Sequence, residues 1–204
     1  MTTEGPVYVS VAVEGASDEG MAHALVRYVG FTLAKPLLSK NGKSKLDPLI
    51  GKLARTGVYN PWIVFRDADS DCPVALREEL IGAREHDGAF ELRIAQSMTE
   101  AWLMADTEGF ARYFSISKDR MSAAPDRLEH AKRKLLQLLL KSRSRKIRGD
   151  MLWQQQAKEG DLYVNRLNDF AQNHWDIDNA RRISPSLDRT VSRLQQMRCI
   201  LSQA

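Results

Sequence analysis

Cysteine is scarce in this chain of 204 residues, which contains only Cys72 and Cys199. Two cysteines so far apart give neither a disulfide framework nor the paired spacing of a zinc site. Long apolar runs are also missing, since no stretch approaches the roughly 20 residues that cross a membrane. The first residues, Met1 to Pro6, have neither the basic flank nor the apolar stretch of a signal peptide. We therefore expect a cytoplasmic protein without membrane partners.

The remaining composition is that of an ordinary globular protein, with 43% hydrophobic and 27% charged residues. The net charge of +4 is modest but unevenly placed. Arginine and lysine gather after Arg127, whereas acidic residues lie near the motifs described below. Such asymmetry points to a polyanionic partner, and we expect nucleic acid, DNA or RNA.

The first half of the chain alternates predicted strands with predicted helices. Valines at alternate positions from Val7 to Val13 indicate a buried strand, and Ser17 is the expected N-cap of the helix that follows. Further helices are expected to open at Asp47-Pro48 and at Pro73. The other predicted strands cover residues 31–38, 62–66 and 90–95. This alternation predicts an α/β fold with a mostly parallel sheet of about four strands flanked by helices.

After Asp106 the pattern is helical. Asp106 is the expected N-cap of a short helix, Ala124-Pro125 is expected to open a long one, and Ser184-Pro185 the last. We predict an α/β domain over residues 1–106 and a C-terminal helical region over residues 107–204 that packs on it.

Three aspartates, Asp67, Asp69 and Asp71, follow the strand formers Trp62 to Phe65 at alternate positions. Because strand side chains alternate between faces, Asp67 and Asp69 point the same way while the chain stays extended, and Asp71 joins them if the pattern continues. Carboxylates that crowd one spot disfavour each other's ionisation, and a divalent cation is the usual remedy. Mg²⁺, or Mn²⁺ in its place, is the expected ion. The alternative is that these residues cap the helix that begins at Pro73.

Four acidic residues lie at or just after predicted strand ends: Glu14, Asp67, Asp69 and Glu100. Ligands of parallel sheets bind at the carboxyl ends of the strands, so we expect these side chains to converge on one site. Glu100 has a second interpretation, because Ser97-x-x-Glu100 is also the pattern of a helix capping box. Both interpretations stay open.

Two basic segments are candidates for phosphate contact. Gly42-Lys43-Ser44 is not a phosphate-binding loop, because that motif needs a glycine where Leu37 stands. It is either a solvated turn or a basic loop in which Lys43 touches phosphate. The second segment follows a predicted helix, and its basic residues are either a solvated face or a sequence-independent phosphate contact; they are Arg143, Arg145, Lys146 and Arg148.

The strand ends resemble the TOPRIM domain of topoisomerases, primases and OLD-type nucleases. In that family a glutamate ends the first strand, an Asp-x-Asp pair ends a later strand, and together they bind Mg²⁺. Glu14 matches the glutamate, and Asp67 and Asp69 match the pair. Gly15 allows a tight turn beside the metal. The resemblance therefore implies a TOPRIM-like fold for the first domain.

The chain is also similar to a bacterial TOPRIM-like family of unknown function. The similar segments are Val13-Glu14-Gly15-x-x-Asp18-Glu19, Val64-x-Arg66-Asp67-x-Asp69 and Glu100-Ala101-Trp102-Leu103-x-Ala105-Asp106, with Ser142–Arg145 and Ser184–Leu187 extending the likeness over most of the chain. Several phage-defence systems pair a TOPRIM nuclease with an ATPase. The resemblance therefore makes an ATPase subunit a candidate partner and phage defence a candidate role.

The function expected from these residues is that of a Mg²⁺-dependent phosphodiesterase, a nuclease acting on nucleic acid. Glu14, Asp67 and Asp69 hold the metal, while Asp71 or Glu100 assists a second ion or positions water. One departure is that the nearest basic residue, Arg66, is expected to face away from Asp67. The alternative is a non-catalytic TOPRIM-like subunit that binds a partner protein such as the ATPase.

Overall fold

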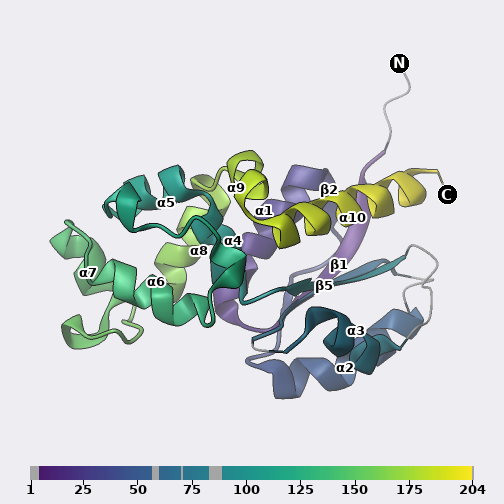
Figure 1. Ribbon diagram of the computed structural model, residues 1–204. Helices are drawn as coiled ribbons and strands as arrows, with labels where there is room; N and C mark the ends of the chain where they lie inside the picture. Colours follow the sequence, from purple (N-terminus) through teal and green to yellow (C-terminus); the bar gives the residue numbers. More distant parts are fainter. Residues whose placement is uncertain (1–4, 57–59, 70, 83–88, 204) are drawn as a thin grey trace.

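The computed structural model describes residues 5–56, 60–69, 71–82 and 89–203, and it confirms the predicted α/β fold class (Figure 1). The start of the chain, Met1 to Glu4, lies outside the described residues. The sheet is parallel throughout, in the order β2-β1-β4-β5, and a short fifth strand, β3, also pairs with β1. The strands are β1 (Val7–Val13), β2 (Phe31–Leu33), β3 (Leu38–Ser39), β4 (Trp62–Asp67) and β5 (Phe90–Ala95).

The sheet has five strands instead of about four because the segment 31–38 forms two short strands. Pro36 lies between them and has no amide hydrogen to give to a ladder. β2 pairs with the first half of β1, with Val7 opposite Phe31, and β3 pairs with the end of β1, with Ala12 opposite Leu38. Both fragments thus support the strand that leads to Glu14.

Helices cover both faces of the sheet (Figure 1). On one face, Val9 and Val11 of β1 pack in a large apolar cluster with residues of α1 (Glu19–Val29) and α10 (Pro185–Ser202). On the other face, a smaller cluster joins Ala12, Val64 and Leu92 to residues of α2 (Lys43–Thr56), and α3 (Pro73–Ile81) lies beside α2.

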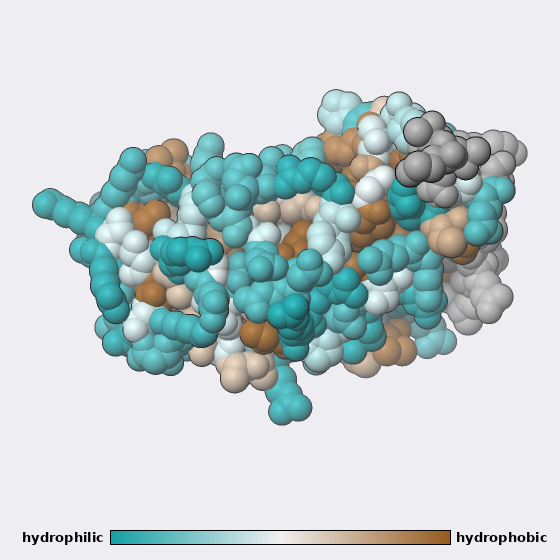
Figure 2. All heavy atoms as spheres, turned by 90° about the horizontal axis from the view of Figure 1, so that it is seen from above, coloured by the Kyte–Doolittle hydropathy of each residue, from teal (hydrophilic) through white to brown (hydrophobic). Residues whose placement is uncertain are grey.

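The remaining helices form a region at the end of the sheet towards which the strands run (Figure 1). They are α4 (Thr99–Ala105), α5 (Thr107–Tyr113), α6 (Ala131–Leu139), α7 (Arg145–Met151), α8 (Tyr163–Asn173) and α9 (Ile177–Ile183). On the face formed by α5, α9 and α10, hydrophilic residues predominate and apolar ones are scattered (Figure 2). The described part of the chain contains no helix that is long and apolar enough to span a membrane.

Three of the expected helix starts are confirmed, and one of them is Pro73, where α3 begins. The Asp106 carboxylate accepts a hydrogen bond from Gly109 N at 3.0 Å and so caps α5. Ser184 Oγ accepts from Leu187 N at 3.2 Å, with Pro185 in the first turn of α10. Asp106 also accepts from Asp176 N, so this cap ties α5 to the start of α9.

Three expected helix starts are wrong. Ser17 lies inside a short 3₁₀ turn, Ala16–Asp18, and α1 begins only at Glu19. α2 begins at Lys43, and Pro48 lies inside it, because the Asp47 carboxylate binds Arg66 and is not a cap. Only a 3₁₀ turn begins at Pro125; α6 begins at Ala131. Asp126 explains this turn, because its buried carboxylate accepts from Ser184 Oγ at 2.7 Å and from Ser186 N at 2.8 Å.

The apolar core is continuous across the predicted domain boundary at residue 106. The large cluster contains Val11 and Phe65 from the sheet together with Phe110, Phe170 and Leu194 from the later helices. The helical region thus packs on the sheet through a shared core. Division into two domains stays a prediction.

Candidate functional site

Four acidic side chains lie where β1 and β4 end, and we call them the acid cluster: Glu14, Asp18, Asp67 and Glu100. Glu14 directly follows β1, and Asp67 is the last residue of the neighbouring strand β4. Asp18 comes from the turn after Glu14, and Glu100 from the first turn of α4. Three of them are almost fully buried, with exposed fractions of 6% for Asp18, 8% for Asp67 and 3% for Glu100.

Glu14 carries the one carboxylate oxygen in the cluster that is buried without a hydrogen-bond partner, Oε2. Arg66 Nη1 lies 3.2 Å from this oxygen but makes no hydrogen bond to it. Burial raises the pKa of Glu14; the Arg66 charge lowers it, and the charges of Asp69 and Asp18 raise it further. Glu14 Oε2 can therefore still bind a cation or a proton.

Thr99 links Asp67 to Asp18. Its backbone N–H donates to Asp67 Oδ1 at 2.9 Å, and its hydroxyl donates to Asp18 Oδ1 at 2.5 Å. Burial raises the pKa of Asp67 well above its usual range, and the charges of Asp18, Glu100 and Glu14 add to the rise. The pKa of Asp18 is also raised, chiefly by burial. A proton or a cation shared among these groups would relieve the repulsion.

Glu100 faces inward, towards two residues of the helical region. Tyr163 OH donates to Glu100 Oε1 at 3.4 Å, and Lys132 is close enough for its charge to lower the pKa of Glu100. Burial and the charge of Asp18 outweigh these two effects and raise the pKa of Glu100 to about 7. The N-cap of α4 is Met98, and Ser97 Oγ has no hydrogen-bond partner. The capping-box interpretation of Glu100 is therefore wrong.

Arg66 lies on the opposite face of β4 from Asp67, as strand alternation requires, yet it borders the site. Its Nε and Nη2 donate to the two oxygens of Asp47 at 2.8 and 3.1 Å, which fixes the guanidinium in a forked contact. Its Nη1 lies near Glu14 and 3.9 Å from Asp69 Oδ2. Arg66 thus places a buried positive charge between Glu14 and Asp69.

Asp69 and Asp71 do not extend the alternation begun by Asp67. β4 ends at Asp67, and Asp69 has the left-handed φ of 54°. The prediction that the side chains of Asp67 and Asp69 point the same way is therefore wrong. Asp69 Oδ2 instead binds Lys43 Nζ at 2.8 Å. Asp71 is exposed, and the N-cap of α3 is Cys72, so Asp71 does not cap that helix.

The two basic segments lie apart from each other. Lys43, at the start of α2, is exposed and reaches Asp69 at the edge of the site. Arg143, Arg145 and Lys146 are exposed at the start of α7, at the end of the helical region far from the sheet (Figure 1). Arg148 instead donates to the carbonyl of Ser142 and holds that turn together.

Asp18 and Lys132 lie in this site and were not among the expected site residues. In the sequence, Asp18 is typical of an acidic residue in the first turn of a helix, and Lys132 is typical of a solvated helix face. Lys132 Nζ binds Glu159 at 2.6 Å and lies 5.5 Å from the centre of the Tyr163 ring. Its pKa is raised because Glu159, Glu100 and Asp18 together outweigh its burial. Only the fold brings α6 and α8 to the strand ends.

The chemistry of the acid cluster suits a hard divalent cation, because it offers carboxylate oxygens whose charges are poorly compensated. The unpaired Oε2 of Glu14 and the raised pKa values of Glu14 and Asp67 are the observations that fit such an ion. Among the residues that the structure describes, no three Asp, Glu, His or Cys side chains are grouped closely enough to hold a metal as they stand. The donor set therefore fits, but its side chains are not preassembled.

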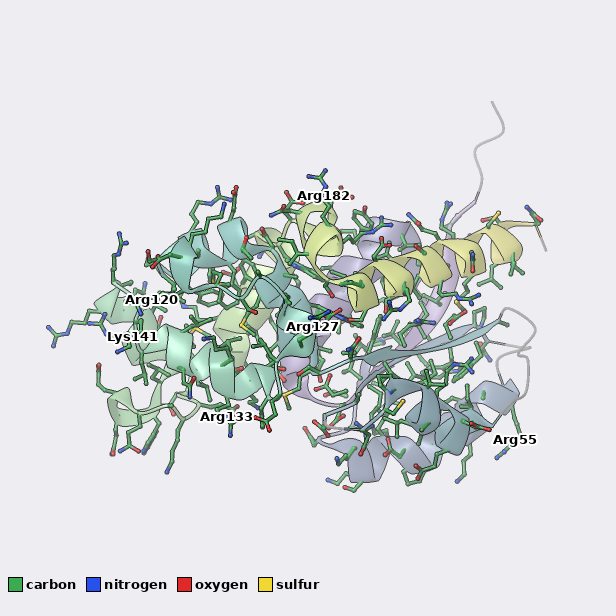
Figure 3. All side chains as sticks on the ribbon, in the orientation of Figure 1. Arg55, Arg120, Arg127, Arg133, Lys141 and Arg182 are labelled. Atoms are coloured by element: carbon green, nitrogen blue, oxygen red, sulfur yellow. The ribbon has the colours of Figure 1, made fainter. Side chains whose placement is uncertain are left out.

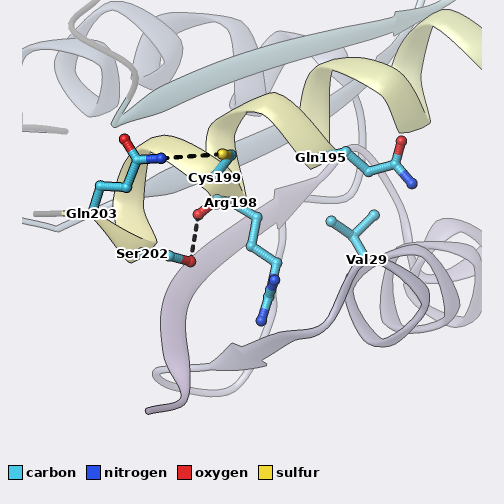
Figure 4. A pocket seen from close by; sticks show the side chains of 6 residues that line it. All are labelled: Val29, Gln195, Arg198, Cys199, Ser202 and Gln203. Carbon is cyan, nitrogen blue, oxygen red and sulfur yellow. Dashed lines mark hydrogen bonds between the residues drawn. The ribbon is translucent and has the colours of Figure 1, made fainter. Parts of the chain in front are cut away.

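The structure also has hollows away from these carboxylates. One of about 410 Å³ lies between Val29 and the last turns of α10 and is lined by Arg198, Cys199 and Ser202 (Figure 4). A larger one of about 850 Å³ lies between β5 and α10. Neither includes a residue of the acid cluster.

Models of protein families, curated proteins and solved structures were all compared with this chain, and none of them matches it.

Proposed function

We propose that the chain is a TOPRIM-like, Mg²⁺-dependent phosphodiesterase that cleaves nucleic acid. The observation that carries the proposal is the acid cluster, in which Glu14 and Asp67 at two adjacent strand ends and Glu100 at the start of α4 have raised pKa values. Carboxylates whose pKa values are raised in this way are typical of functional sites. Their place, at the carboxyl ends of parallel strands, is where such sheets bind ligands. The TOPRIM-like pattern of Glu14, Asp67 and Asp69 supports the same function.

Each residue has a proposed task. Glu14, Asp67 and Asp69 would hold the ion, with Glu100 or Asp71 assisting. A bound Mg²⁺ or Mn²⁺ supplies charge to polarise a phosphate and to make a water more acidic. Thr99 orients Asp67 and Asp18 through its two hydrogen bonds. Lys43 is exposed beside Asp69, where it can meet the phosphate backbone of a substrate.

Lys132 and Glu100 support the reaction from the helical side. A carboxyl group with a pKa of about 7 exchanges its proton easily near neutral pH, which suits general acid or base work. The Lys132 charge lies close enough to affect Glu100 and Asp18. Proton exchange at Glu100 is therefore coupled to the acid beside Asp67.

A non-catalytic subunit is the second candidate, and one observation favours it. Arg66 and Lys43 already neutralise part of the charge of Glu14 and Asp69, so these carboxylates have a structural role without any metal. On this alternative the strand ends would be a rigid, charged surface for a partner protein. The proposed partner is an ATPase subunit, and the proposed setting in both cases is phage defence.

A metal titration tests the proposal. The full chain is incubated with labelled single-stranded DNA, duplex DNA and RNA in EDTA, Mg²⁺ or Mn²⁺, and its melting temperature is measured in the same buffers. We expect cleavage of at least one substrate only with Mg²⁺ or Mn²⁺, together with a rise in melting temperature. A rise in melting temperature without cleavage would support the non-catalytic subunit. If the metal causes neither cleavage nor a rise in melting temperature, the chain does not bind it and the proposal is contradicted.

A further inference from the structure

A long hollow runs along the outer edge of the sheet, between α3, β5 and α10. Its main part has a volume of about 850 Å³, and a neighbouring part of about 210 Å³ shares Arg77, Arg93 and Arg189 with it. The second part reaches Gln96, just beyond the end of β5. β5 is the edge strand of the described sheet and pairs only with β4 on its inner side. We call the two parts together the arginine groove.

Four arginines from three separate segments line the arginine groove: Arg77 of α3, Arg93 of β5, and Arg189 and Arg193 of α10. Two carboxylates also line it, but both are already engaged. Glu91 binds Arg93 at 3.2 Å, and Asp188 binds Arg181 outside the groove at 2.8 Å. The four positive charges exceed the two negative ones, so the groove has an excess of positive charge.

Arg93 keeps one hydrogen-bond donor that the fold does not satisfy. Its Nε is buried and has no hydrogen-bond partner. Burial lowers the pKa of Arg93; Glu91 raises it, and the charges of Arg193 and Arg77 lower it further. Like charges held together at a half-buried position cost free energy, and an anion in the groove would recover it.

We propose that the arginine groove binds a single strand of nucleic acid and leads it to the acid cluster. The connection is short, because Gln96 lies three residues before Thr99, whose N–H donates to Asp67. Asp69 N also donates to Ser97 O at 3.0 Å, which joins the end of the groove to the loop after β4. Binding of the strand does not depend on the proposed function; only its cleavage at the acid cluster rests on it.

The side chains favour nucleic acid over an acidic peptide as the occupant. Arginine presents a planar fork that matches phosphate oxygens, and positively charged grooves that follow the backbone are the usual way to hold a single strand. Arg189 and Arg193 stand one helical turn apart, about 6 Å along α10, which sets up a repeated contact. A peptide that added to β5 would use backbone hydrogen bonds and would leave the need for four arginines unexplained.

Binding in EDTA separates the arginine groove from catalysis. Fluorescence anisotropy measures how the full chain binds a labelled oligothymidine at several salt concentrations. The test variant is Arg189→Gln with Arg193→Gln, two exposed positions where glutamine keeps a good helix former. The matched control is Arg120→Gln with Arg182→Gln, which removes the same charge from the exposed positions labelled in Figure 3.

We expect the groove variant to bind at least ten-fold more weakly than the parent, and the control to stay within two-fold. The slope of log affinity against log salt should fall by about 1.4, or about 0.7 for each phosphate contact with a single strand. Equal losses in both variants would show unspecific attraction and overturn the proposal. Unchanged binding in the groove variant, with its melting temperature intact, would overturn it as well.

Two further results separate this proposal from a peptide-binding groove and from the proposed function. If labelled decaglutamate binds the parent more tightly than oligothymidine and fails to bind the groove variant, the groove is a peptide site and the proposal is wrong. If the parent binds oligothymidine through the groove but cleaves nothing in Mg²⁺ or Mn²⁺, the proposed function fails and the groove stands.

Discussion

Asp67 is a buried carboxylate that is repelled by its acidic neighbours. It is buried, its pKa is raised well above the usual range, and three other carboxylates add to that rise. Removing its charge should therefore have opposite effects on stability and on activity. This opposition distinguishes a functional acid from a structural one.

Asp67→Asn should abolish Mn²⁺-dependent cleavage and raise the melting temperature in EDTA. The amide keeps an oxygen that can accept from Thr99 N but carries no charge for Asp18 and Glu100 to repel. A gain of about 1 kcal/mol corresponds to roughly 2–4 °C for a protein of this size. Asp161→Asn, at an exposed position, is the matched control and should change neither property. Cleavage by Asp67→Asn at the parent rate would remove Asp67 from the catalytic site.

Glu100 gives the metal-free protein a pH-dependent stability. Its pKa of about 7 in the folded chain lies above its ordinary value of 4.5. The folded chain therefore holds this proton more tightly than the unfolded chain does, and the benefit is complete below about pH 4.5. It is lost as the pH rises through 7, by an amount of order 3 kcal/mol.

Glu100→Gln should therefore gain stability relative to the parent between pH 5 and pH 8. Urea unfolding in EDTA at several pH values measures the difference between the two chains. A difference that stays flat with pH would show that Glu100 has the same pKa in the folded and the unfolded chain. If the variant also loses Mn²⁺-dependent cleavage although its melting temperature is not lowered, Glu100 belongs to the site. Retained cleavage would restrict Glu100 to a structural role.

At this scale the sequence predicted the acids better than their surroundings. Glu14 and Asp67 follow strands whose patterns are plain, so their position at strand ends could be predicted. Asp69 could not be placed, because a left-handed residue after β4 ends the alternation on which the prediction relied. Lys132 and Tyr163 reach Glu100 across 32 or more residues of chain, and no local pattern reports such a contact.

Helix α1 is positioned by an unusually close approach to α8. A Cβ added to Gly20 would lie 2.5 Å from the Cα of Asn168, which is closer than real contacts allow. The Asn168 side chain accepts from Gly20 N and donates to Ala16 O, both at 2.9 Å. One asparagine thus fixes the turn that carries Asp18.

Gly20→Ala should destabilise the protein although alanine is the better helix former. Overpacking of this kind costs about 1–3 kcal/mol, which outweighs the gain in helix propensity. Gly149 of α7 is the matched control, because it is exposed and an added Cβ meets nothing within 4 Å. Gly149→Ala should stabilise by up to about 1 kcal/mol. Urea unfolding of both variants measures the two signs, and a stable Gly20→Ala would mean that α8 can move away.

The start of α7 carries the basic residues that the sequence suggested for phosphate contact. Replacing Arg143, Arg145 and Lys146 with glutamine should weaken binding to any nucleic acid regardless of its sequence. The salt slope should fall by about 0.7–0.9 for each phosphate that the variant no longer neutralises, while metal affinity stays unchanged. Arg148→Gln is a separate test of the Ser142 turn and should lower the melting temperature. An unchanged slope in the triple variant would restrict this segment to a solvated or protein-binding role.

Element starts were predictable where a cap acts locally and not where it acts at a distance. Asp106 and Ser184 bond to residues three positions ahead, and both starts were predicted. Asp47 and Asp126 bond instead to Arg66 and to the turn before α10, so their helices begin elsewhere. A local pattern cannot separate these two uses of an aspartate.

The whole molecule behaves as one packed body around the sheet. Leu187, Val191 and Leu194 of α10 belong to the same cluster as Val9 and Val11 of β1. A fragment of residues 1–106 would expose this face of the sheet, and we expect it to lack a cooperative thermal transition. Near-ultraviolet circular dichroism of the fragment and the full chain measures this. A sharp transition in the fragment alone would establish the first 106 residues as an independent domain.

The α/β class followed from the alternation of strands and helices, and the structure confirms it. The arginine groove could not be predicted from the sequence, because Arg77, Arg93 and Arg193 are brought together only by the path of α10 along the sheet edge. Charge that gathers from distant segments leaves no run of basic residues in the sequence.

The place of α10 also sets the order of events during synthesis. A ribosome releases the chain from its first residue onward, so Glu14 and Asp67 emerge long before Tyr163 and α10. The face of β1 that α10 covers is closed only when α10 has docked. The contacts of Tyr163 and Lys132 beside Glu100 form only after α8 and α6 have emerged. A nascent chain from which α6 and α8 have not yet emerged therefore lacks the finished surroundings of Glu100. If the chain is the proposed nuclease, it cannot cleave the messenger RNA that encodes it until these helices have left the ribosome and packed.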